Sequence, residues 1–374
     1  MIYVLAMMSF VVLAISTRLN KKIHEFKKRD MYSQSSLLKD LPSVSVCIPA
    51  RNEHHAMADC LERILASHYP KLEIIVIDDE SVDSTPTLVK SFAHEGVRFI
   101  AGGEVPDGWL GKNHALGTLM QEASGTYVLF IDVDTKINPD TIGQMVAYAA
   151  ETNLSMMSIL PMRSDVLRAN VLFAPLRYFW HLVFSNKYNP VAASSAWMVH
   201  RQAFKRSVGD FTRFKTAVEP EIEIARVFAA DKSYRFLIGD SLLGLSYEKK
   251  LSSQVETSVR LRYPMLRFSV FRSLAVIIAL VLFATAPYIF IIGALVVNNM
   301  YMLLLAVLLL LIELYTYNLY LRAVWKHGNV SGSCLVTLIL LEDAYVTFLS
   351  MIGYLTNTVT WKGRPISRDI KRGR

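Results

Sequence analysis

The stretch YVLFIDVD, residues 127–134, decides the fold that the sequence predicts. Its first five residues, Tyr127–Ile131, form an apolar run of the length of a buried strand, and Asp132 and Asp134 follow directly. In open α/β sheets, ligands bind beyond the carboxyl ends of the strands. The two acids therefore stand where such a sheet would hold a ligand.

The residues before this stretch repeat the same alternation of a short apolar run and a helical pattern. The apolar runs predict strands at Val44–Ile48, Leu72–Ile77 and Val97–Ile100. Helical periodicity covers the segments Glu53–Ala66, Asp83–His94 and Lys112–Ala123. Strands that are apolar on both faces and alternate with helices indicate a mostly parallel sheet with helices on both faces. The sequence thus predicts an α/β fold.

Polar clusters also follow the first two predicted strands. The first cluster consists of Pro49, Ala50, Arg51, Asn52 and Glu53, and the second begins with Asp78 and Asp79. A single cluster is weak evidence, because Asp and Asn are common in turns and caps, and Asp83 could merely cap the second helix. Three clusters at one edge of one sheet are harder to explain as caps. We therefore expect a binding site there.

The residue types in these clusters suit a nucleotide that carries phosphates and a metal. Mg2+ and Mn2+ prefer hard oxygen ligands, often one or two carboxylates together with phosphate oxygens. Asp132 and Asp134 could divide this work, with one acid toward the ribose and the other toward the metal. Gly111 and Lys112 open a predicted helix, which offers free backbone N–H groups and a cation to phosphate. Asp79 could accept a hydrogen bond from the base.

The composition indicates a protein that is partly embedded in a membrane. The chain is 52% hydrophobic, and its mean hydropathy of +0.31 is too high for an ordinary soluble enzyme. In a chain with apolar segments, the net charge of +8 is best explained by membrane topology and by contact with anionic lipid headgroups. The sequence has no basic stripe with interleaved aromatic residues, so nucleic-acid binding is not indicated. The three cysteines have no paired spacing, which favours a reducing compartment.

Apolar segments lie at both ends of the chain. Residues 1–17 precede a basic run, which favours a signal anchor with the amino terminus outside and the next domain in the cytoplasm, although an interfacial helix is an alternative. Three further segments qualify as spans, at Leu274–Val297, Tyr301–Leu321 and Leu335–Leu355. Basic residues favour the inside for the loop with Arg322, Lys326 and His327. They also favour the inside for the tail, which contains Lys362, Arg364, Arg368, Lys371, Arg372 and Arg374.

The last apolar segment carries Glu342 and Asp343 at mid-depth, where charge is expensive. We therefore expect it to re-enter or to lie at the surface; a tail that breaks the charge bias is the alternative. The sequence predicts a membrane anchor at residues 1–20, a basic linker at 21–42 and a catalytic domain at 43–255. An amphipathic interfacial segment is expected at 256–272, membrane segments at 273–358 and a basic cytoplasmic tail at 359–374.

The order and spacing of these motifs resemble those of the inverting glycosyltransferase family 2, whose members have a GT-A fold. The resemblance covers about residues 43–250 and rests on the clusters at Pro49–Glu53, Asp78–Thr85, Gly111-Lys112 and Asp132–Asp134. The segments Gly108–Lys112 and Trp361–Arg364 more specifically resemble membrane members that glycosylate carotenoid or hopanoid-type lipids.

The resemblance implies a site for a nucleotide-diphospho-sugar, often UDP-linked, and a general base. It places Ala50, Glu53 and Asp79 near the nucleoside and makes Asp134 the main metal ligand. The family base lies in a Glu-Asp pair, and Glu221 occupies the place of that Asp. Pro220 replaces the preceding acid, so Glu219 is the alternative base, and dipole-complementing acids at a helix start are the structural alternative.

Two further segments resemble acceptor-side features of the family. The stretch with Ser195 and Trp197 resembles the loop and strand under the acceptor, although a single Trp could equally belong to the core. The segment with Arg260 and Arg262 resembles the Gln-Arg-x-Arg-Trp segment of processive polysaccharide synthases, but the Gln and the Trp are replaced in this chain. The two arginines could reach diphosphate or a lipid headgroup. Plain surface charge is the alternative for both arginines.

The sequence therefore predicts a multi-pass enzyme of the inner cell membrane with a cytoplasmic catalytic domain. We expect it to transfer one hexose, with inversion and with Mg2+ or Mn2+, from a nucleotide-sugar donor to a lipid acceptor hydroxyl or carboxyl. A processive polysaccharide synthase is one alternative, and a non-catalytic membrane scaffold with a degenerate sugar-nucleotide domain is another. The sugar, the acceptor lipid and the oligomeric state are left open by the sequence.

Overall fold

The computed structural model describes residues 1–27, 41–165, 169–325 and 330–366, in two compact units. The α/β unit comprises Phe26–Ser164, Ser185–Glu248 and Lys362–Arg374. The helical unit comprises Met1–Glu25, Asp165–Phe184 and Lys249–Trp361. Most of the predicted linker lies outside the described residues, as do Lys326 and His327 and the tail cations Arg368, Lys371, Arg372 and Arg374.

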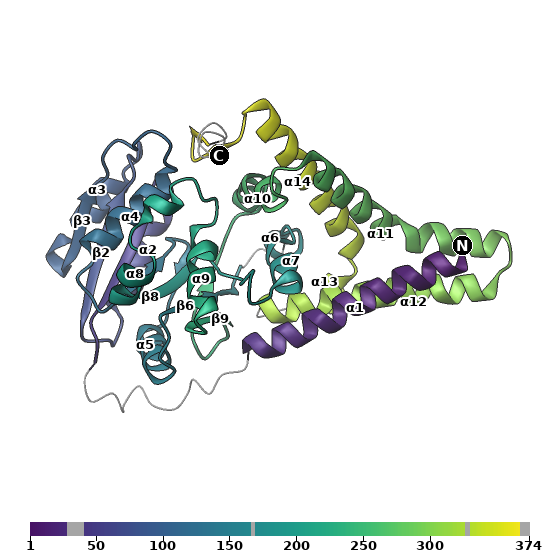
Figure 1. Ribbon diagram of the computed structural model, residues 1–374, viewed down its shortest axis with the longest axis horizontal. Helices are drawn as coiled ribbons and strands as arrows, with labels where there is room; N and C mark the ends of the chain where they lie inside the picture. Colours follow the sequence, from purple (N-terminus) through teal and green to yellow (C-terminus); the bar gives the residue numbers. More distant parts are fainter. Residues whose placement is uncertain (28–40, 166–168, 326–329, 367–374) are drawn as a thin grey trace. The chain divides into compact units, whose positions relative to one another are not determined.

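The α/β unit is built on a seven-stranded sheet with the order β3-β2-β1-β4-β8-β6-β9 (Figure 1). The strands are β1 (Val44–Ala50), β2 (Leu72–Asp78), β3 (Val97–Ala101), β4 (Tyr127–Ile131), β6 (Met156–Leu160), β8 (Ala196–His200) and β9 (Tyr234–Ile238). Neighbouring strands are parallel except where β8 meets β4 and β6. The predicted mostly parallel α/β fold is confirmed.

Two hydrophobic clusters cover the two faces of this sheet. One face packs on residues of α2 (His54–Leu65), α3 (Thr85–Ser91) and α5 (Thr141–Glu151). The other packs on residues of α4 (Gly111–Glu122), α8 (Arg201–Ser207), the 3-10 turn η2 (Phe211–Phe214) and α9 (Pro220–Ala230). In α2, for example, the buried residues Met57, Cys60, Leu61 and Ile64 recur at helical spacing, so one stripe of the helix faces the sheet.

The strand register brings the polar clusters to one edge of the sheet. Ala50 at the end of β1 pairs with Asp78 at the end of β2. Ile131 at the end of β4 pairs with Ala196 at the start of β8. A small second sheet of β5 (Thr135–Lys136), β10 (Ser246–Tyr247) and β7 (Met162–Arg163) begins directly after Asp134.

The helical unit contains the apolar segments. In the described part of the chain, four helices are long and apolar enough to cross a membrane, namely α1 (Ile2–Lys27), α11 (Val270–Val296), α12 (Met300–Val324) and α14 (Val336–Thr356). The first is longer than the apolar run 1–17, because the helix continues through the basic residues that follow. The unit also holds α6 (Ala169–Leu172), α7 (Arg177–Phe184), α10 (Leu251–Met265), α13 (Val330–Ser333) and the strand β11 (Thr360–Trp361).

Three of the long helices share a core. Leu5, Met8 and Val12 of α1 pack with buried residues of α11 and α12, namely Ala286, Ala294, Met302, Ala306 and Leu309. Figure 1 shows these three helices side by side. The residues of this cluster come from α1, α11 and α12, whereas α14 packs on α10 and α11.

One segment inside the predicted catalytic domain groups with the helices. Residues 165–184 belong to the helical unit, where Phe179 of α7 packs edge-to-face on Tyr320 of α12 with ring centroids 5.6 Å apart. The amphipathic segment expected at 256–272 begins inside α10, which starts at Leu251.

Candidate active site

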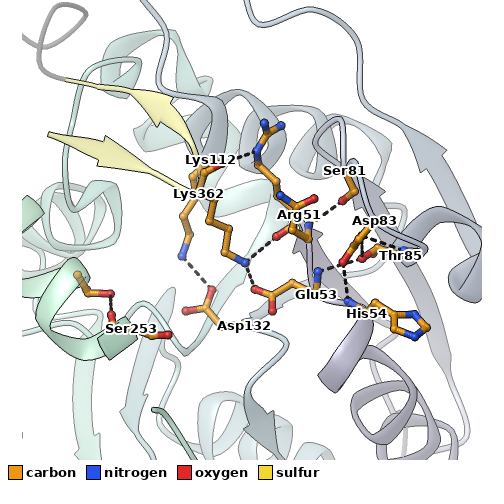
Figure 2. A network of polar contacts seen from close by, with 12 residues as sticks. Arg51, Glu53, His54, Ser81, Asp83, Thr85, Lys112, Asp132, Ser253 and Lys362 are labelled. Carbon is orange, nitrogen blue, oxygen red and sulfur yellow. Dashed lines mark hydrogen bonds and ion pairs between the residues drawn. The ribbon is translucent and has the colours of Figure 1, made fainter. Parts of the chain in front are cut away.

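The loops after β1 and β2 are joined by hydrogen bonds at the carboxyl edge of the sheet (Figure 2). The backbone N–H of Asn52 donates to Ser81 Oγ at 2.8 Å, and Asn52 Oδ1 accepts from the N–H of Val82 at 2.9 Å. The N–H of Glu53 donates to Thr85 Oγ1 at 2.9 Å. These bonds fix the first two polar clusters relative to each other.

Asp83 has a structural role in this joint. Its Oδ1 accepts from the N–H of Thr85 at 3.0 Å, and its Oδ2 accepts from the N–H of His54 at 3.3 Å. His54 and Thr85 are the first residues of α2 and α3, so one carboxylate satisfies an N–H at the start of each helix. The capping interpretation therefore describes Asp83 well.

Arg51 forms hydrogen bonds with the backbone of the loop after β2. Its guanidinium donates to the backbone oxygens of Asp79 and Glu80, the latter at 2.9 Å. Glu80 has a φ of +53°, a left-handed conformation that is uncommon outside glycine and that these contacts help to hold. The structure thus places Arg51 among the predicted donor-binding residues, where it orders the backbone next to Asp79.

The two acids after β2 have different partners. Asp78 Oδ2 accepts from the N–H of Ser81 at 3.1 Å, which closes the turn. Asp79 is only 4% exposed, and its Oδ1 accepts from Arg364 at 2.7 Å. Its Oδ2 has no hydrogen-bond partner among the described residues. Burial raises the pKa of Asp79, and the guanidinium of Arg364 counteracts this rise.

Asp132, directly after β4, contacts the start of α4. Lys112 Nζ donates to Asp132 Oδ1 at 2.8 Å, and both side chains are partly exposed, at 18% and 26% (Figure 2). The N–H of Asp132 donates to the backbone oxygen of Ser195 at 3.0 Å, which ties this strand end to the loop before β8. The structure therefore brings Lys112 and Asp132, which were predicted on the donor side, close to Ser195, which was predicted on the acceptor side.

The donor set fits a hard divalent cation that shares its ligands with a substrate. Asp132 and Asp134 supply carboxylate oxygens at one strand end, and no group of three or more His, Cys, Asp or Glu side chains in the described ranges forms a complete metal cage. Mg2+ in phosphate-transfer sites is commonly held by one or two carboxylates plus phosphate oxygens. Asp132 and Asp134 offer the one or two carboxylates that this pattern requires.

Glu221 lies in the first turn of α9 and is 2% exposed. A short turn joins the end of α9 to the start of β9, which runs parallel to β6 and therefore in the direction of β4. The start of α9 must then lie toward the carboxyl edge of the sheet. Glu219 is the residue before the helix and is half-buried. Pro220 takes the first helical position, which proline tolerates well.

Two expected acceptor residues have other places in the structure. Trp197 is 1% exposed and stacks on Phe130 with ring centroids 4.2 Å apart, so it belongs to the core and the expected acceptor contact is corrected. Arg262 is buried and forms an ion pair with Asp343 of α14, which commits its charge inside the helical unit. Arg260 lies over the ring of Trp361 at 5.6 Å.

Three residues of the cluster were absent from the predicted site. Lys362 donates to the backbone oxygen of Arg51 at 2.7 Å and pairs with Glu53, and Arg364 pairs with Asp79 and Glu80. The sequence motif Trp361–Arg364 contains both cations and could have drawn attention to them. The motif does not show that they lie beside the loops after β1 and β2. Glu80 belongs to the acidic cluster after β2, and the sequence does not indicate which acids of that cluster form the site.

Comparisons with known proteins find a family match that lies mostly in the α/β unit. Residues 45–207 match the model of the family described as "Glycosyl transferase family 2". A Bacillus subtilis protein named "Probable glycosyltransferase YdaM" is 35% identical over 101 residues, which are 26% of this chain and 24% of that protein. The 4,4'-diaponeurosporenoate glycosyltransferase of Staphylococcus aureus is 27% identical over 139 residues, 36% of each chain. The matches thus span about a quarter to a third of these relatives.

A solved structure supports the fold at larger scale. The mannosyltransferase PcManGT from Pyrobaculum calidifontis, in complex with GDP-Man and Mn2+, superposes with a TM-score of 0.52 at 17% identity, covering 94% of this chain and 99% of that one. At this identity the likeness concerns the fold. The family match, the sheet order and the converging acids together identify residues 45–207 as a glycosyltransferase family 2 domain with a GT-A fold.

Proposed function

We propose that this protein transfers a single hexose from a nucleotide-diphospho-sugar, with UDP as the expected nucleotide, to a hydroxyl or carboxyl of a lipid that stays in the membrane. The observation that carries the proposal is the meeting of Asp79, Asp132 and Lys112 at the carboxyl edge of a parallel sheet within a family 2 domain. That edge is where such sheets bind ligands.

The donor is expected to lie with its base near Asp79 and its diphosphate near the start of α4. Asp79 Oδ2 is buried without a partner among the residues that the structure describes, and a buried acceptor in that state is costly unless a ligand satisfies it. Gly111 and Lys112 begin α4, so free backbone N–H groups and an ammonium are available to phosphate oxygens. Asp132 takes the ribose side of the site.

The expected metal is Mg2+ or Mn2+, with Asp134 as main ligand and Asp132 beside it. When bound, such a cation would neutralise negative charge on the departing diphosphate. The protein itself orients the donor through Asp79 and Lys112, so that the anomeric carbon faces the acceptor.

Glu221 is the expected general base, and Glu219 is the alternative. The base accepts the proton of the acceptor hydroxyl while the oxygen attacks the anomeric carbon from the face opposite the diphosphate, which inverts the configuration. Glu221 suits this role because it is buried at a helix start, where the backbone dipole stabilises its anion. Transfer of this kind gains a factor of about 100 to 10,000 from a well-placed base.

The membrane-embedded acceptor is inferred from the helical unit. Three helices with a common core, α1, α11 and α12, present large apolar side chains outward, among them Phe10, Phe271, Ile289 and Tyr301. Such a surface matches a bilayer. The relative from Staphylococcus aureus is named for transfer to a carotenoid acid, which supports an acceptor of the lipid class.

We further propose that α14 does not cross the membrane. Lys362 is paired with Glu53 inside the α/β unit, so the chain leaves that unit at Glu248 and re-enters it at Lys362 on one side of the bilayer. An even number of crossings must lie between, and α11 and α12 supply two. The side chain of Asp343 in α14 is fully buried against Arg262 of α10, as fits a re-entrant or surface-lying helix.

We expect the α/β unit to be cytoplasmic, at the inner membrane, because basic residues follow the apolar run within α1. A variant with Arg374→Cys, in a background without Cys334, should react with an impermeant maleimide only in inside-out vesicles. Labelling in right-side-out vesicles would contradict either the even number of crossings or the cytoplasmic orientation.

The test of the function is mass spectrometry of membrane lipids from cells that express the protein or its Asp134→Asn variant. The active protein should produce a new lipid that is one hexose heavier than its precursor, and the variant should not. A soluble polymer made from donor alone would favour the processive synthase. Absence of any donor turnover by purified protein would favour the scaffold.

A further inference from the structure

Two cations from the end of the described chain lie against the acids of the first two loops. Arg364 donates to Asp79 Oδ1 at 2.7 Å and pairs with Glu80. Lys362 pairs with Glu53 and donates to the backbone oxygen of Arg51 at 2.7 Å (Figure 2). All of these residues belong to the α/β unit, although 285 positions separate Asp79 from Arg364 along the chain.

The contact is reciprocal and therefore well defined. Arg51 Nε donates to the backbone oxygen of Lys362 at 3.4 Å, while Lys362 returns a hydrogen bond to the backbone oxygen of Arg51. Arg51 also donates to the backbone oxygens of Asp79 and Glu80. The segment Lys362-Gly363-Arg364 is thus joined to the loops after β1 and β2 by both its backbone and its side chains.

Arg364 uses only one oxygen of Asp79. The other, Oδ2, has no partner among the described residues, although Asp79 is only 4% exposed. A carboxylate with one oxygen held by a guanidinium has its second oxygen fixed in direction. Buried acceptors in native proteins nearly always have partners, so an oriented and unsatisfied oxygen points to a ligand that donates a proton to it.

The backbone around Asp79 is constrained at two positions, Glu80 and Gly111. Glu80, next to Asp79, has the left-handed φ of +53°. A Cβ at Gly111 would lie 2.8 Å from Asp79 Oδ2 and 2.6 Å from a guanidinium nitrogen of Arg364. Only glycine therefore allows the start of α4 to approach the Asp79–Arg364 pair so closely.

We propose that Lys362-Gly363-Arg364 forms part of the donor site, with Arg364 as the positioning residue that directs Asp79 Oδ2 toward a ring N–H of the donor's base. This inference rests on the proposed function. Uracil and guanine carry a ring N–H on their pairing edge, whereas cytosine and adenine carry a ring acceptor there. The fixed carboxylate oxygen attracts the first pair and repels the second, so Arg364 sets the choice of base. Lys362 supports it by neutralising Glu53.

The test measures binding of UDP, GDP, CDP and ADP to the purified full-length protein in detergent with Mg2+, by calorimetry. The wild type should bind UDP or GDP at least about tenfold more tightly than CDP and ADP. The ring N–H of uracil or guanine can donate a hydrogen bond to the charged Asp79, whereas cytosine and adenine have no ring N–H at that position. Arg364→Gln should weaken the preferred nucleotide by about tenfold and reduce the preference to about threefold or less.

Three additional variants separate positioning from folding. Asp79→Asn should lose the preference as well, and adding Arg364→Gln to it should cause little further loss, because both changes act on one oxygen. Arg364→Lys keeps the charge but cannot bridge Asp79 and Glu80 with a planar fork, so an intermediate preference is expected even if the glutamine variant folds poorly. Arg63→Gln is the matched control, since Arg63 forms an exposed pair with Asp59 in the same unit.

The outcomes distinguish this inference from the proposed function. An unchanged base preference in folded Arg364→Gln and Arg364→Lys would overturn the role of Arg364 while leaving the nucleotide site intact. Additive losses in the double variant would show that Arg364 does not act through Asp79, and would overturn it too. If the wild type binds none of the four nucleotides, the proposed function fails together with the inference.

Discussion

Asp343 in the helical unit and Asp79 in the α/β unit are both buried acids that pair with an arginine, yet their second oxygens differ. Asp343 is fully buried; one oxygen pairs with Arg262 and the other accepts from Trp180 Nε1 at 2.8 Å. Asp79 gives one oxygen to Arg364, and the other has no partner in the described part of the chain. A completely satisfied acid stabilises a structure, whereas a half-satisfied acid at a sheet edge is available to a ligand.

The same contrast applies to the lysine and the acid at the end of β4. Lys112 and Asp132 form an ion pair that is still partly exposed, at 18% and 26% of their side chains. Such a pair contributes little to stability by itself, because solvent screens it. Its value lies in holding opposite charges ready at the place where a diphosphate and a sugar would meet. We therefore expect changes in the α/β site to affect activity, and changes at Asp343 to affect stability.

The largest effect is expected at Glu221. Glu221→Gln should lower kcat by about 100-fold to 10,000-fold while leaving the Kd of the nucleotide unchanged, because the amide cannot accept the acceptor's proton. Initial rates and calorimetry on the same preparation would measure both. Glu223→Gln, an exposed acid in the same helical turn, is the matched control. If Glu219→Gln abolishes transfer and Glu221→Gln does not, the base is Glu219.

A loss of stability is expected at Asp343. Asp343→Asn should destabilise the protein by about 3–5 kcal/mol, because it leaves the guanidinium of Arg262 buried without its counter-charge. Thermal unfolding in detergent would measure the change, and nucleotide affinity of the folded fraction should stay the same. Glu25→Gln, in the exposed pair with Lys22, should change stability by less than about 1 kcal/mol. A folded Asp343→Asn protein without nucleotide affinity would break the comparison.

The smallest effect is expected at Trp197. Trp197→Phe should cost roughly 1–3 kcal/mol of stability, since it removes volume from a buried stack on Phe130. The KM for the acceptor should not change, because Trp197 is 1% exposed. Phe130→Leu, on the other side of the stack, should have a similar effect on thermal unfolding. A selective rise in acceptor KM for Trp197→Phe would restore its acceptor role.

The strands and helices around the site could be predicted closely from the sequence. The predicted strand Tyr127–Ile131 is confirmed as β4 with the same bounds, and the first two strands extend by two residues and one residue at their carboxyl ends. Prediction worked here because strands buried on both faces are continuous apolar runs, and polar residues end them abruptly. Lys112 and Asp132 were both predicted at this edge, whereas their ion pair is seen only in the structure.

Other features depended on contacts that no local pattern contains. The core position of Trp197, the pairing of Arg262 with Asp343 and the grouping of residues 165–184 with the helices all join residues far apart in the sequence. An arginine beside a membrane segment looks the same whether it faces solvent, a headgroup or a buried acid. Only the packing of α10 on α14 distinguishes these cases.

The sequence by itself determined the α/β fold, the edge at which its acids gather and the apolar helices, because each of these is encoded in residues close along the chain. The tertiary structure decided that one oxygen of Asp79 pairs with Arg364 and that the other has no partner among the described residues. It also placed Lys362 and Arg364 beside Glu53 and Asp79. The physical reason is that hydrogen bonds and ion pairs depend on distances of about 3 Å between atoms, which periodicity and composition do not specify.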